Sequence, residues 1–397
     1  MYLSLIAIGL CLYACNYSDN ETGVESPNVH YSVDLKIVYE GYHENWCWFH
    51  PRSAKCGNDE EMVILMQPWV TSHADFYQFL SVMKTSNGGR EWSEPVSLAD
   101  SLGEKWVDNR TMVRICDVTP QWHKASKKVL ATGVTVYYRD SMQFSPSPRQ
   151  TCYFHYTPET GKWSSWKMLK MPDLPEFFHC SVGCSQWVDF PNGDILLPIY
   201  FLRDPNVDRY SVTVLRCHFN GETLDYIEHG DFLDLDRVRG LCEPSLIEFK
   251  GKYYLTLRND VNGMVTVSED GLHYKNPVEW MFNDSTCVWT ENTQQHWVKS
   301  PKALFLVYTS SHRKESENVF RGRAPLFIAQ FDEKKMVLMK ETEKIIVPNN
   351  SAPLGNFGAF DLNENESWVT TSEGTDSINS KTGADGRVYV ARIKWEN

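Results

Sequence analysis

Short runs of apolar, aromatic and β-branched residues recur along the chain, and Gly, Pro, Asn or Asp bounds each run. Runs of this length and composition are typical of β-strands. They lie at Glu61–Met66, Val129–Tyr138, Ile195–Phe201, Tyr210–Phe219, Lys252–Leu257, Ala303–Tyr308, Leu326–Phe331 and Arg387–Ile393. Outside the N-terminus, no segment keeps the i, i+3, i+4, i+7 apolar spacing of an amphipathic helix over about three turns. The pattern therefore predicts an all-β chain.

Two segments share a second pattern, in which a hydroxyl residue is followed by Asn or Asp two positions later, then by glycine and an aromatic residue. They are Thr85–Trp92 and Ser268–Tyr274. Asn or Asp hydrogen-bonds its own turn and glycine supplies a positive φ, so each segment is predicted to be a hairpin whose aromatic side chain packs between strands. Both resemble the Asp-box hairpins that join the third and fourth strands of a blade in sialidase-type propellers. Two copies indicate a repeated unit.

The hairpins and the strand pattern together predict a β-propeller, and an aromatic content of 13% agrees with it. About 370 residues follow the N-terminal leader, and blades of ~40–50 residues give seven or eight of them. We predict a single seven-bladed propeller domain over residues 31–397. A β-sandwich or two packed domains is the alternative, because the length alone allows two domains. No Pro/Ser-rich linker separates two such parts of the chain.

The N-terminus carries an apolar stretch, Tyr2–Ala14, that is too short to span a bilayer and is followed by Cys15 and the polar run Asn16–Ser26. The four residues that end at Cys15 resemble a bacterial lipobox, in which the cysteine is lipidated. We therefore predict a leader over residues 1–15, a tether over 16–30, and an exported periplasmic or cell-surface lipoprotein that meets the membrane only through the lipid. The alternative is an ordinary cleaved signal peptide, and the lack of Lys or Arg before the apolar run departs from both patterns.

Charge and cysteine content narrow the range of partners. A net charge of −12 argues against nucleic acid and anionic membrane surfaces as partners, so any acidic substrate must be bound by local Arg, Lys or His side chains. Cys180 and Cys184 lack a second pair at zinc spacing, so we expect no metal and no other cofactor. Most cysteines are expected to be apolar core filler. The protein is expected to be a monomer.

The densest concentration of candidate chemistry is the segment Trp46–Lys55, which places His50 close to Arg52 and Lys55 among aromatic residues. This combination is typical of a site for a sugar acid, because aromatic rings stack on pyranoses, Arg pairs with a carboxylate and His moves protons near neutral pH. The alternative is a buried strand with a hydrogen-bonded histidine. Further polar clusters predict a lined cavity and lie at Thr119–His123, Phe177–His179, Arg239–Ser245, Leu257–Asp260, Asn292–Trp297 and Arg321–Pro325.

In order along the chain, these segments resemble the bacterial sialidase-like propellers that process L-rhamnose-α-1,4-D-glucuronic acid, the family 145 type of glycoside hydrolase or rhamnosyl-glucuronate lyase. The motifs that carry the resemblance include Cys47–Arg52, Met66–Gln67, Asp75–Phe76, Asp194–Pro198, Glu243–Ser245, Leu257–Asn259 and Asn356–Gly358, and the match runs from Tyr39 to Trp395. The resemblance implies a seven-bladed propeller that acts on the terminal rhamnose of arabinogalactan glycans. It also implies a single essential histidine on the posterior face, and this histidine matches His50.

Two positions depart from the pattern of the family. Val134 stands where relatives carry histidine after Thr132-Gly133, and Cys242 replaces a tyrosine. If the second histidine takes part in catalysis, Val134 would impair activity.

The resemblance leads us to expect release of terminal α-L-rhamnose, with His50 as acid/base and the substrate carboxylate assisting. The residues expected to bind the glycan are Trp48, Arg52, Lys55, Gln67, His123, Glu243, Arg258, Gln295, His296 and Arg323. Glycoside hydrolysis ordinarily uses two carboxylates; no such pair stands out, although Asp75, Asp117, Glu243 and Asp260 remain open.

Three other functions stay open. β-Elimination at the same linkage would need an arginine at the uronate carboxylate and His50 as the base. An exo-α-sialidase would need an arginine triad, a Tyr/Glu pair and an Asp, opened by an Arg-Ile-Pro motif that we do not find. The third is a surface glycan-binding propeller without catalysis. The site could also lie in the central funnel, with His123, His179, Arg258 and His296, rather than on the face of His50.

Overall fold

The computed structural model describes residues 28–70, 76–140, 142–143, 148–204, 206–291, 293–374 and 385–396. The predicted leader over residues 1–15 and most of the predicted tether over 16–30 lie outside these ranges, as do Asp75 and Asn292.

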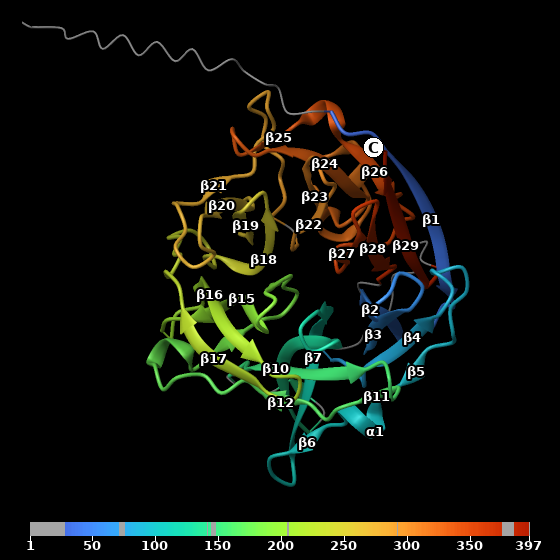
Figure 1. Ribbon diagram of the computed structural model, residues 1–397, viewed down its shortest axis with the longest axis vertical. Helices are drawn as coiled ribbons and strands as arrows, with labels where there is room; N and C mark the ends of the chain where they lie inside the picture. The colour runs from blue at the N-terminus through green and yellow to red at the C-terminus, as the bar shows by residue number, and fades with distance from the viewer. Residues whose placement is uncertain are drawn as a thin grey trace, which may run out of the picture.

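Within the described residues, the strands form six antiparallel sheets arranged around a central axis, so the fold is a six-bladed β-propeller (Figure 1). Blade 1 consists of β2 (Trp46–Lys55), β3 (Met62–Val70), β4 (Ser81–Thr85) and β5 (Val96–Ser97). Blade 2 consists of β7 (Thr111–His123), β8 (Lys128–Arg139), β10 (Thr151–Thr157), β11 (Lys162–Trp163) and β12 (Lys167–Met168), flanked by β6 (Lys105–Trp106) and β9 (Met142–Gln143). Blade 3 consists of β13 (Cys180–Ser181), β14 (Val188–Asp189), β15 (Asp194–Leu202), β16 (Tyr210–Phe219) and β17 (Leu224–His229).

Blade 4 consists of β18 (Cys242–Phe249), β19 (Lys252–Arg258), β20 (Met264–Ser268) and β21 (Val278–Glu279). Blade 5 consists of β22 (His296–Lys299), β23 (Leu304–Tyr308), β24 (Leu326–Asp332), β25 (Val337–Leu338) and β26 (Lys344–Val347). Blade 6 consists of β27 (Gly358–Asn363), β28 (Glu366–Ser372), β29 (Arg387–Trp395) and β1 (Tyr31–Glu40). The described helical segments are short: α1 (Ala99–Leu102), η1 (Pro175–Phe177), η2 (Lys314–Ser316), η3 (Phe320–Gly322) and η4 (Lys340–Thr342). None of them has the length and apolar character needed to cross a membrane.

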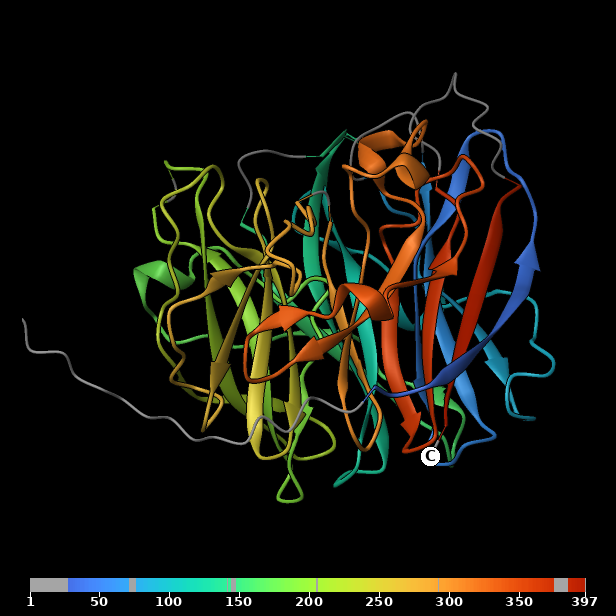
Figure 2. The ribbon, with the colours of Figure 1, turned by 90° about the horizontal axis from the view of Figure 1, so that it is seen from above.

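The ring closes through the N-terminal strand. β1 pairs with β29 in a register that runs from Tyr31 opposite Trp395 to Glu40 opposite Arg387, and Figure 1 shows the two strands side by side at the edge of blade 6. Tyr31 packs edge-on against the rings of Phe305 and Trp395. The closing strand is therefore held by both hydrogen bonds and apolar contact. Seen from above, the strands of all blades run between the two faces of the molecule (Figure 2).

The strand predictions are confirmed, since each predicted run falls on a strand, from β3 and β8 to β24 and β29. The prediction of seven blades is not confirmed. Seven blades would require ~40–50 residues in each blade. Blade 2 alone runs from Lys105 to Met168, because β7 and β8 are long and short extra strands flank them.

The two predicted hairpins join β4 to β5 and β20 to β21, the third and fourth strands of their sheets. In the first, the Gly89 amide donates to Thr85 Oγ1 at 3.2 Å and the Glu91 amide to Asn87 Oδ1 at 3.0 Å. The second repeats this arrangement around Ser268 and Asp270. The hydroxyl and the Asx side chain thus bind the turn amides, which is the role that the sequence pattern predicted for them.

A second feature recurs on the innermost strands. Each inner strand of blades 1, 2 and 4 changes register at a bulge, between Phe49 and Arg52, Cys116 and Thr119, and Cys242 and Ser245. In blade 3 the inner strand is interrupted between β13 and β14. One residue in each interruption has a left-handed backbone, at φ 50° for His50, 53° for Asp117, 68° for Cys184 and 43° for Glu243. Non-glycine residues seldom adopt this conformation, and it is found disproportionately at functional sites.

Candidate active site

The four left-handed residues meet in one cavity of about 440 Å³ on the central axis. The cavity receives side chains from all six blades, so it exists only when the ring is complete. Its lining residues are Phe49, His50, Tyr77, Asp117, Val136, Arg149, His179, Cys184, Tyr200, Tyr210, Arg239, Cys242, Glu243, Arg258, Arg321, Arg323 and Asn356.

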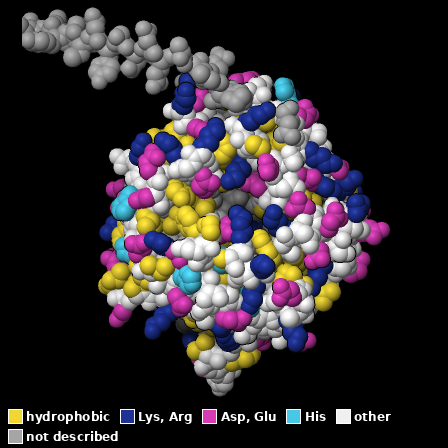
Figure 3. All heavy atoms as spheres, in the orientation of Figure 1, with side chains coloured by type: hydrophobic (Ala, Val, Ile, Leu, Met, Phe, Trp, Pro, Cys, Tyr) yellow, Lys and Arg dark blue, Asp and Glu magenta, His cyan; other side chains and the backbone are white. Residues whose placement is uncertain are grey.

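The cavity is strongly basic. Five arginines line it against two carboxylates, those of Asp117 and Glu243, although the whole chain carries a net charge of −12. Basic and acidic side chains are interspersed over the face seen in Figure 3, so the excess of arginine is local to the cavity. A concave site lined by one sign of charge concentrates ligands of the opposite sign. The cavity therefore favours an anion.

An ion-pair network fixes part of this charge. Arg258 donates through Nη1 to both oxygens of Glu243, at 2.9 and 2.8 Å, and Arg239 donates through Nε to Asp260 at 2.5 Å. Burial alone would raise the pKa of Glu243, but the Arg258, Arg323 and Arg239 guanidinium groups together outweigh burial and hold that pKa below its ordinary value. Glu243 is therefore ionised at neutral pH, and the network holds Arg258 in place on the wall of the cavity.

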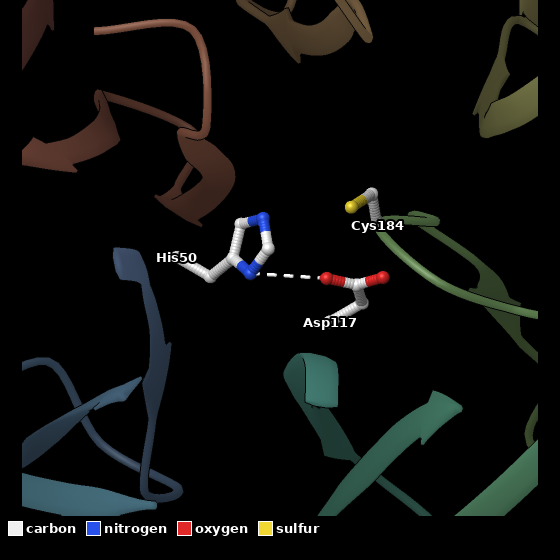
Figure 4. Close-up of side chains that lie close together, drawn as sticks. All are labelled: His50, Asp117 and Cys184. Carbon is white, nitrogen blue, oxygen red and sulfur yellow. Dashed lines mark ion pairs between the residues drawn. The ribbon is translucent and has the colours of Figure 1, made fainter. Parts of the chain in front are cut away.

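His50 is 5% exposed and lies 3.0 Å, measured from Nδ1, from Oδ1 of Asp117 (Figure 4). Its pKa lies well below the ordinary value of 6.5, mainly through burial and further through the Arg52 guanidinium, while a hydrogen bond to the Asn356 side chain opposes the shift. The imidazole is neutral at pH 7. A neutral imidazole in an anion-binding cavity can accept a proton from a bound substrate.

Two kinds of proton donor face the same cavity. His179 accepts the Arg149 amide at Nδ1 over 3.3 Å, so its proton is on Nε2, and burial together with Arg149 lowers its pKa to about 4. Nε2 of His179 has no hydrogen-bond partner among the described residues. The phenols of Tyr200 and Tyr210 have pKa values raised mainly by burial, so both keep their protons at neutral pH.

Of the predicted site residues, His50, Glu243, Arg258 and Arg323 line the cavity. Trp48 does not; it is buried in the core cluster between blades 6 and 1, because it lies two residues before the bulge and points into the sheet packing. Gln67 does not line the cavity either, and it donates to the carbonyls of Gln78 and Ile115.

His123, Gln295 and His296 do not line the cavity. His123 contacts Ser126 Oγ at 2.8 Å and the Gly193 carbonyl at 3.2 Å. Gln295 donates to the carbonyls of Thr290 and Thr293, and His296 contacts Ser245 Oγ at 2.7 Å.

Arg52 and Lys55 do not line the cavity. Arg52 donates to the carbonyls of Phe357 and Val118, both at 3.3 Å, and so bridges blades 1, 6 and 2 across the axis. Lys55 donates to the Leu362 carbonyl at 2.6 Å and lines a second cavity of about 290 Å³ at the far ends of the inner strands. From the sequence, the face of His50 and the central funnel were alternative locations for the site. Instead, His50 shares one cavity with His179 and Arg258, because its bulge turns the side chain toward the axis.

Several cavity residues were missed as site residues. Arg239 and Arg321 fall in the polar clusters noted above, so a signal was present, whereas Arg149, Tyr200 and Tyr210 carry none that separates them from ordinary strand and loop residues. Of the two departures from the family pattern, Val134 is fully buried in the core cluster beside Cys116 and Tyr77 and does not line the cavity. Cys242 does line it, and burial raises the pKa of its thiol to about 12.

The amino-acid sequence matches no protein-family model and no curated protein. Several solved structures are similar in fold. A protein of unknown function from Dyadobacter fermentans matches at 13% identity with a TM-score of 0.66, over 93% of this chain and 100% of the other. The sialidase of Trypanosoma rangeli matches at 13% identity and a TM-score of 0.57, over 88% and 55% of the two chains, and the NanB sialidase of Streptococcus pneumoniae at 9% and 0.61, over 90% and 70%. The chain thus spans little more than half of the trypanosomal enzyme. These matches show a sialidase-like propeller fold.

Proposed function

We propose that this protein is a carbohydrate-active enzyme that binds a uronic acid in the central cavity and releases terminal α-L-rhamnose from rhamnosyl-α-1,4-glucuronic acid caps of arabinogalactan glycans. The observation that carries the proposal is a neutral, buried imidazole, His50, inside a cavity lined by five arginines. The specificity for rhamnose rests on the resemblance given above, and the chemistry rests on the cavity.

The arginines account for recognition of the glycan. A guanidinium pairs with a carboxylate through two parallel hydrogen bonds, which fixes the orientation of the sugar as well as its charge. Arg321 and Arg323 of blade 5 line the cavity, and we assign the uronate carboxylate to these two side chains. The charge of the substrate carboxylate would then be neutralised where the reaction takes place.

The ionisation state of His50 favours β-elimination over hydrolysis. Hydrolysis begins with a protonated acid at the leaving oxygen, whereas the imidazole of His50 is unprotonated at neutral pH. In elimination, His50 removes the C5 proton, the electron pair forms the C4–C5 double bond, and the C4–O bond to rhamnose breaks. The departing oxygen takes a proton from a tyrosine hydroxyl. Tyr210 on the cavity wall carries this proton at neutral pH, because burial raises the pKa of its phenol.

A synthetic rhamnosyl-glucuronate disaccharide tests both the substrate and the route. Free rhamnose and the ultraviolet absorbance of an unsaturated uronate are followed together. Elimination predicts that both rise in step, and hydrolysis predicts rhamnose without absorbance. A matched disaccharide with the carboxyl group reduced to an alcohol should not react. If no rhamnose is released from the unmodified disaccharide, the proposed function is wrong.

Sialic acid is the second candidate substrate. Arg258, Arg321 and Arg323 share the cavity with Glu243 and two tyrosines, which are residue types that a sialidase uses. Against it, the inner strand of blade 1 presents His50 rather than an arginine to this cavity. Sialyllactose in the same assay distinguishes the two, because release of sialic acid at a rate comparable with that of rhamnose would favour the sialidase.

A further inference from the structure

Three potential metal ligands meet at the wall of the cavity. His50 comes from β2, Asp117 from β7 and Cys184 from the segment between β13 and β14, and Figure 4 shows the three side chains directed toward one another. One ligand atom of each lies within 4.8 Å of the other two, and all three residues are buried. The described residues contain no other group of three His, Cys, Asp or Glu side chains that meets this spacing.

The backbone holds the three residues in equivalent positions on consecutive blades. They follow one another at equal intervals along the sequence, at positions 50, 117 and 184, and each has a left-handed backbone. The Cys184 amide donates to the Asp117 carbonyl at 3.2 Å, so two of the three segments are also tied directly. The grouping is therefore built by the fold rather than by flexible surface side chains.

One ligand atom of the cluster has no hydrogen-bond partner among the described residues. Nδ1 of His50 makes no hydrogen bond although Oδ1 of Asp117 lies 3.0 Å away. The imidazole is hydrogen-bonded to the Asn356 side chain, which is the arrangement in which the second ring nitrogen of a metal-bound histidine is oriented by an outer partner. A cation bound by Nδ1 would give this nitrogen a partner. Oδ1 of Asp117 is close enough to bind the same ion, while Oδ2 of Asp117 lies 3.9 Å from Nη1 of Arg149.

The ligands of the cluster, rather than the arginines around it, suit a divalent cation. A carboxylate and a thiolate together neutralise the two positive charges of the ion, so the loaded site is itself neutral. Burial raises the pKa of the Cys184 thiol and the Arg52 guanidinium opposes that shift, so the ion itself must displace the thiol proton. Nitrogen, oxygen and sulfur ligands in one set are typical of zinc, and three protein ligands leave a fourth position for water or substrate.

We propose that His50, Asp117 and Cys184 bind a divalent cation of the zinc type, with the fourth coordination position open to the cavity. On binding, the thiol releases its proton to solvent, and the sulfur, a ring nitrogen and a carboxylate oxygen bond the ion. The metal-loaded protein then lacks the free imidazole that the proposed elimination uses. Added Zn²⁺ would therefore inhibit that reaction.

The test measures metal binding without any glycan. The full chain, stripped of metal with a chelator, is titrated with Zn²⁺ by calorimetry and with Co²⁺ by absorption spectroscopy. We expect one ion per chain and a thiolate-to-cobalt charge-transfer band. Cys184→Ala and Asp117→Asn should each weaken Zn²⁺ binding more than about 100-fold, since even outer partners of metal ligands are worth about 10- to 100-fold. Cys180→Ala is the matched control, a buried cysteine outside the cluster, and should bind as the wild type does.

Two results would overturn the proposal: no binding of either ion by the wild type at millimolar concentration, or binding that survives in both ligand variants. If Cys184→Ala does not fold, the cobalt spectrum of the wild type and the Asp117→Asn titration still decide. Because no substrate is present, the outcome does not depend on whether the protein cleaves rhamnosyl-glucuronate.

Discussion

At the residue scale, the cavity depends on single residues that the inner strands hold in a left-handed backbone. His50, Asp117, Cys184 and Glu243 are each placed this way, and all four line the cavity. In a regular strand, successive side chains alternate between the two faces of the sheet. A bulge breaks the alternation and re-aims one side chain, here toward the axis.

The role assigned to His50 predicts the effect of removing its imidazole. His50→Gln should lower the rate of rhamnose release by about 10²- to 10⁴-fold, the usual contribution of a positioned proton-transfer group. The matched control is His123→Gln, because His123 is equally buried but contacts Ser126 and Gly193 outside the cavity. The measurement is rhamnose release by both variants, with circular dichroism to confirm folding. A His50→Gln protein that keeps more than about a tenth of the rate would contradict the assignment.

The buried histidine His179 predicts a dependence of stability on pH. Its folded pKa of about 4 lies below the unfolded value of 6.5. Between these values the unfolded chain binds the proton and the folded chain does not, so stability is lost as the pH falls from 6.5 toward 4. This single group accounts for about 3 kcal/mol over that window.

Urea unfolding of the wild type and His179→Gln at pH 7 and pH 4.5 checks the prediction. The variant should lose less stability on acidification than the wild type. His312→Gln, at an exposed histidine, should lose as much as the wild type. Equal losses in the wild type and His179→Gln would show that His179 does not stay neutral in the folded protein.

At the element scale, two hairpin turns of blade 4 contain a glycine with a left-handed backbone. Gly271, in the turn between β20 and β21, has φ +80°, and a Cβ there would lie 2.3 Å from Leu196 Cδ1. Gly251, in the turn between β18 and β19, has φ +76° but no atom within 4 Å of such a Cβ. The two positions share the backbone requirement and differ in packing.

We therefore predict that Gly251→Ala destabilises the protein by about 1–2 kcal/mol, the cost of a left-handed backbone for an L-residue. Gly271→Ala should cost about 1–3 kcal/mol more, because the methyl group also overpacks the contact with the neighbouring blade. Denaturant unfolding of the two variants measures the difference. Equal losses would mean that Leu196 moves aside without cost.

At the scale of the whole molecule, the cavity requires a closed ring, and the ring closes through β1. Side chains from all six blades line the cavity. Loosening the contacts between blades 5, 6 and 1 would therefore shift the lining residues of these blades relative to those of blades 2, 3 and 4. Arg52 and Gln186 reinforce the closed form, since Gln186 donates to the carbonyls of Trp297 and Ala359 across the axis.

The closing strand can be weakened at one residue. Tyr31 is 6% exposed and packs on Phe305 and Trp395, whereas Ile37 in the same strand is 50% exposed. Tyr31→Ala should cost about 3–5 kcal/mol, as for other large buried aromatic residues, and Ile37→Ala should stay within about 0.5 kcal/mol of the wild type. Thermal unfolding compares the two. A similar melting temperature for both variants would show that Tyr31 does not hold the closing strand.

The amino-acid sequence by itself determined the local structure. Strand positions, the absence of long helices among the described residues and the two glycine hairpins follow from composition and spacing, because strands and tight turns depend on neighbours within a few residues. His50 also stood out, since its charged and aromatic neighbours are adjacent in the sequence.

Only the tertiary structure decided which residues share the cavity and how many blades form the ring. Trp48, Arg52 and Lys55 are close to His50 in the sequence, but strand alternation and the bulge separate their side chains. Trp48 packs in the core, Arg52 donates to carbonyls of the neighbouring blades, and Lys55 lines the cavity at the far ends of the inner strands. Asp117, Cys184 and Arg149 join His50 from other blades, at distances along the chain that no local pattern links. Closure of the ring through hydrogen bonds between β1 and β29 brings these distant segments together, and that closure is a property of the whole chain.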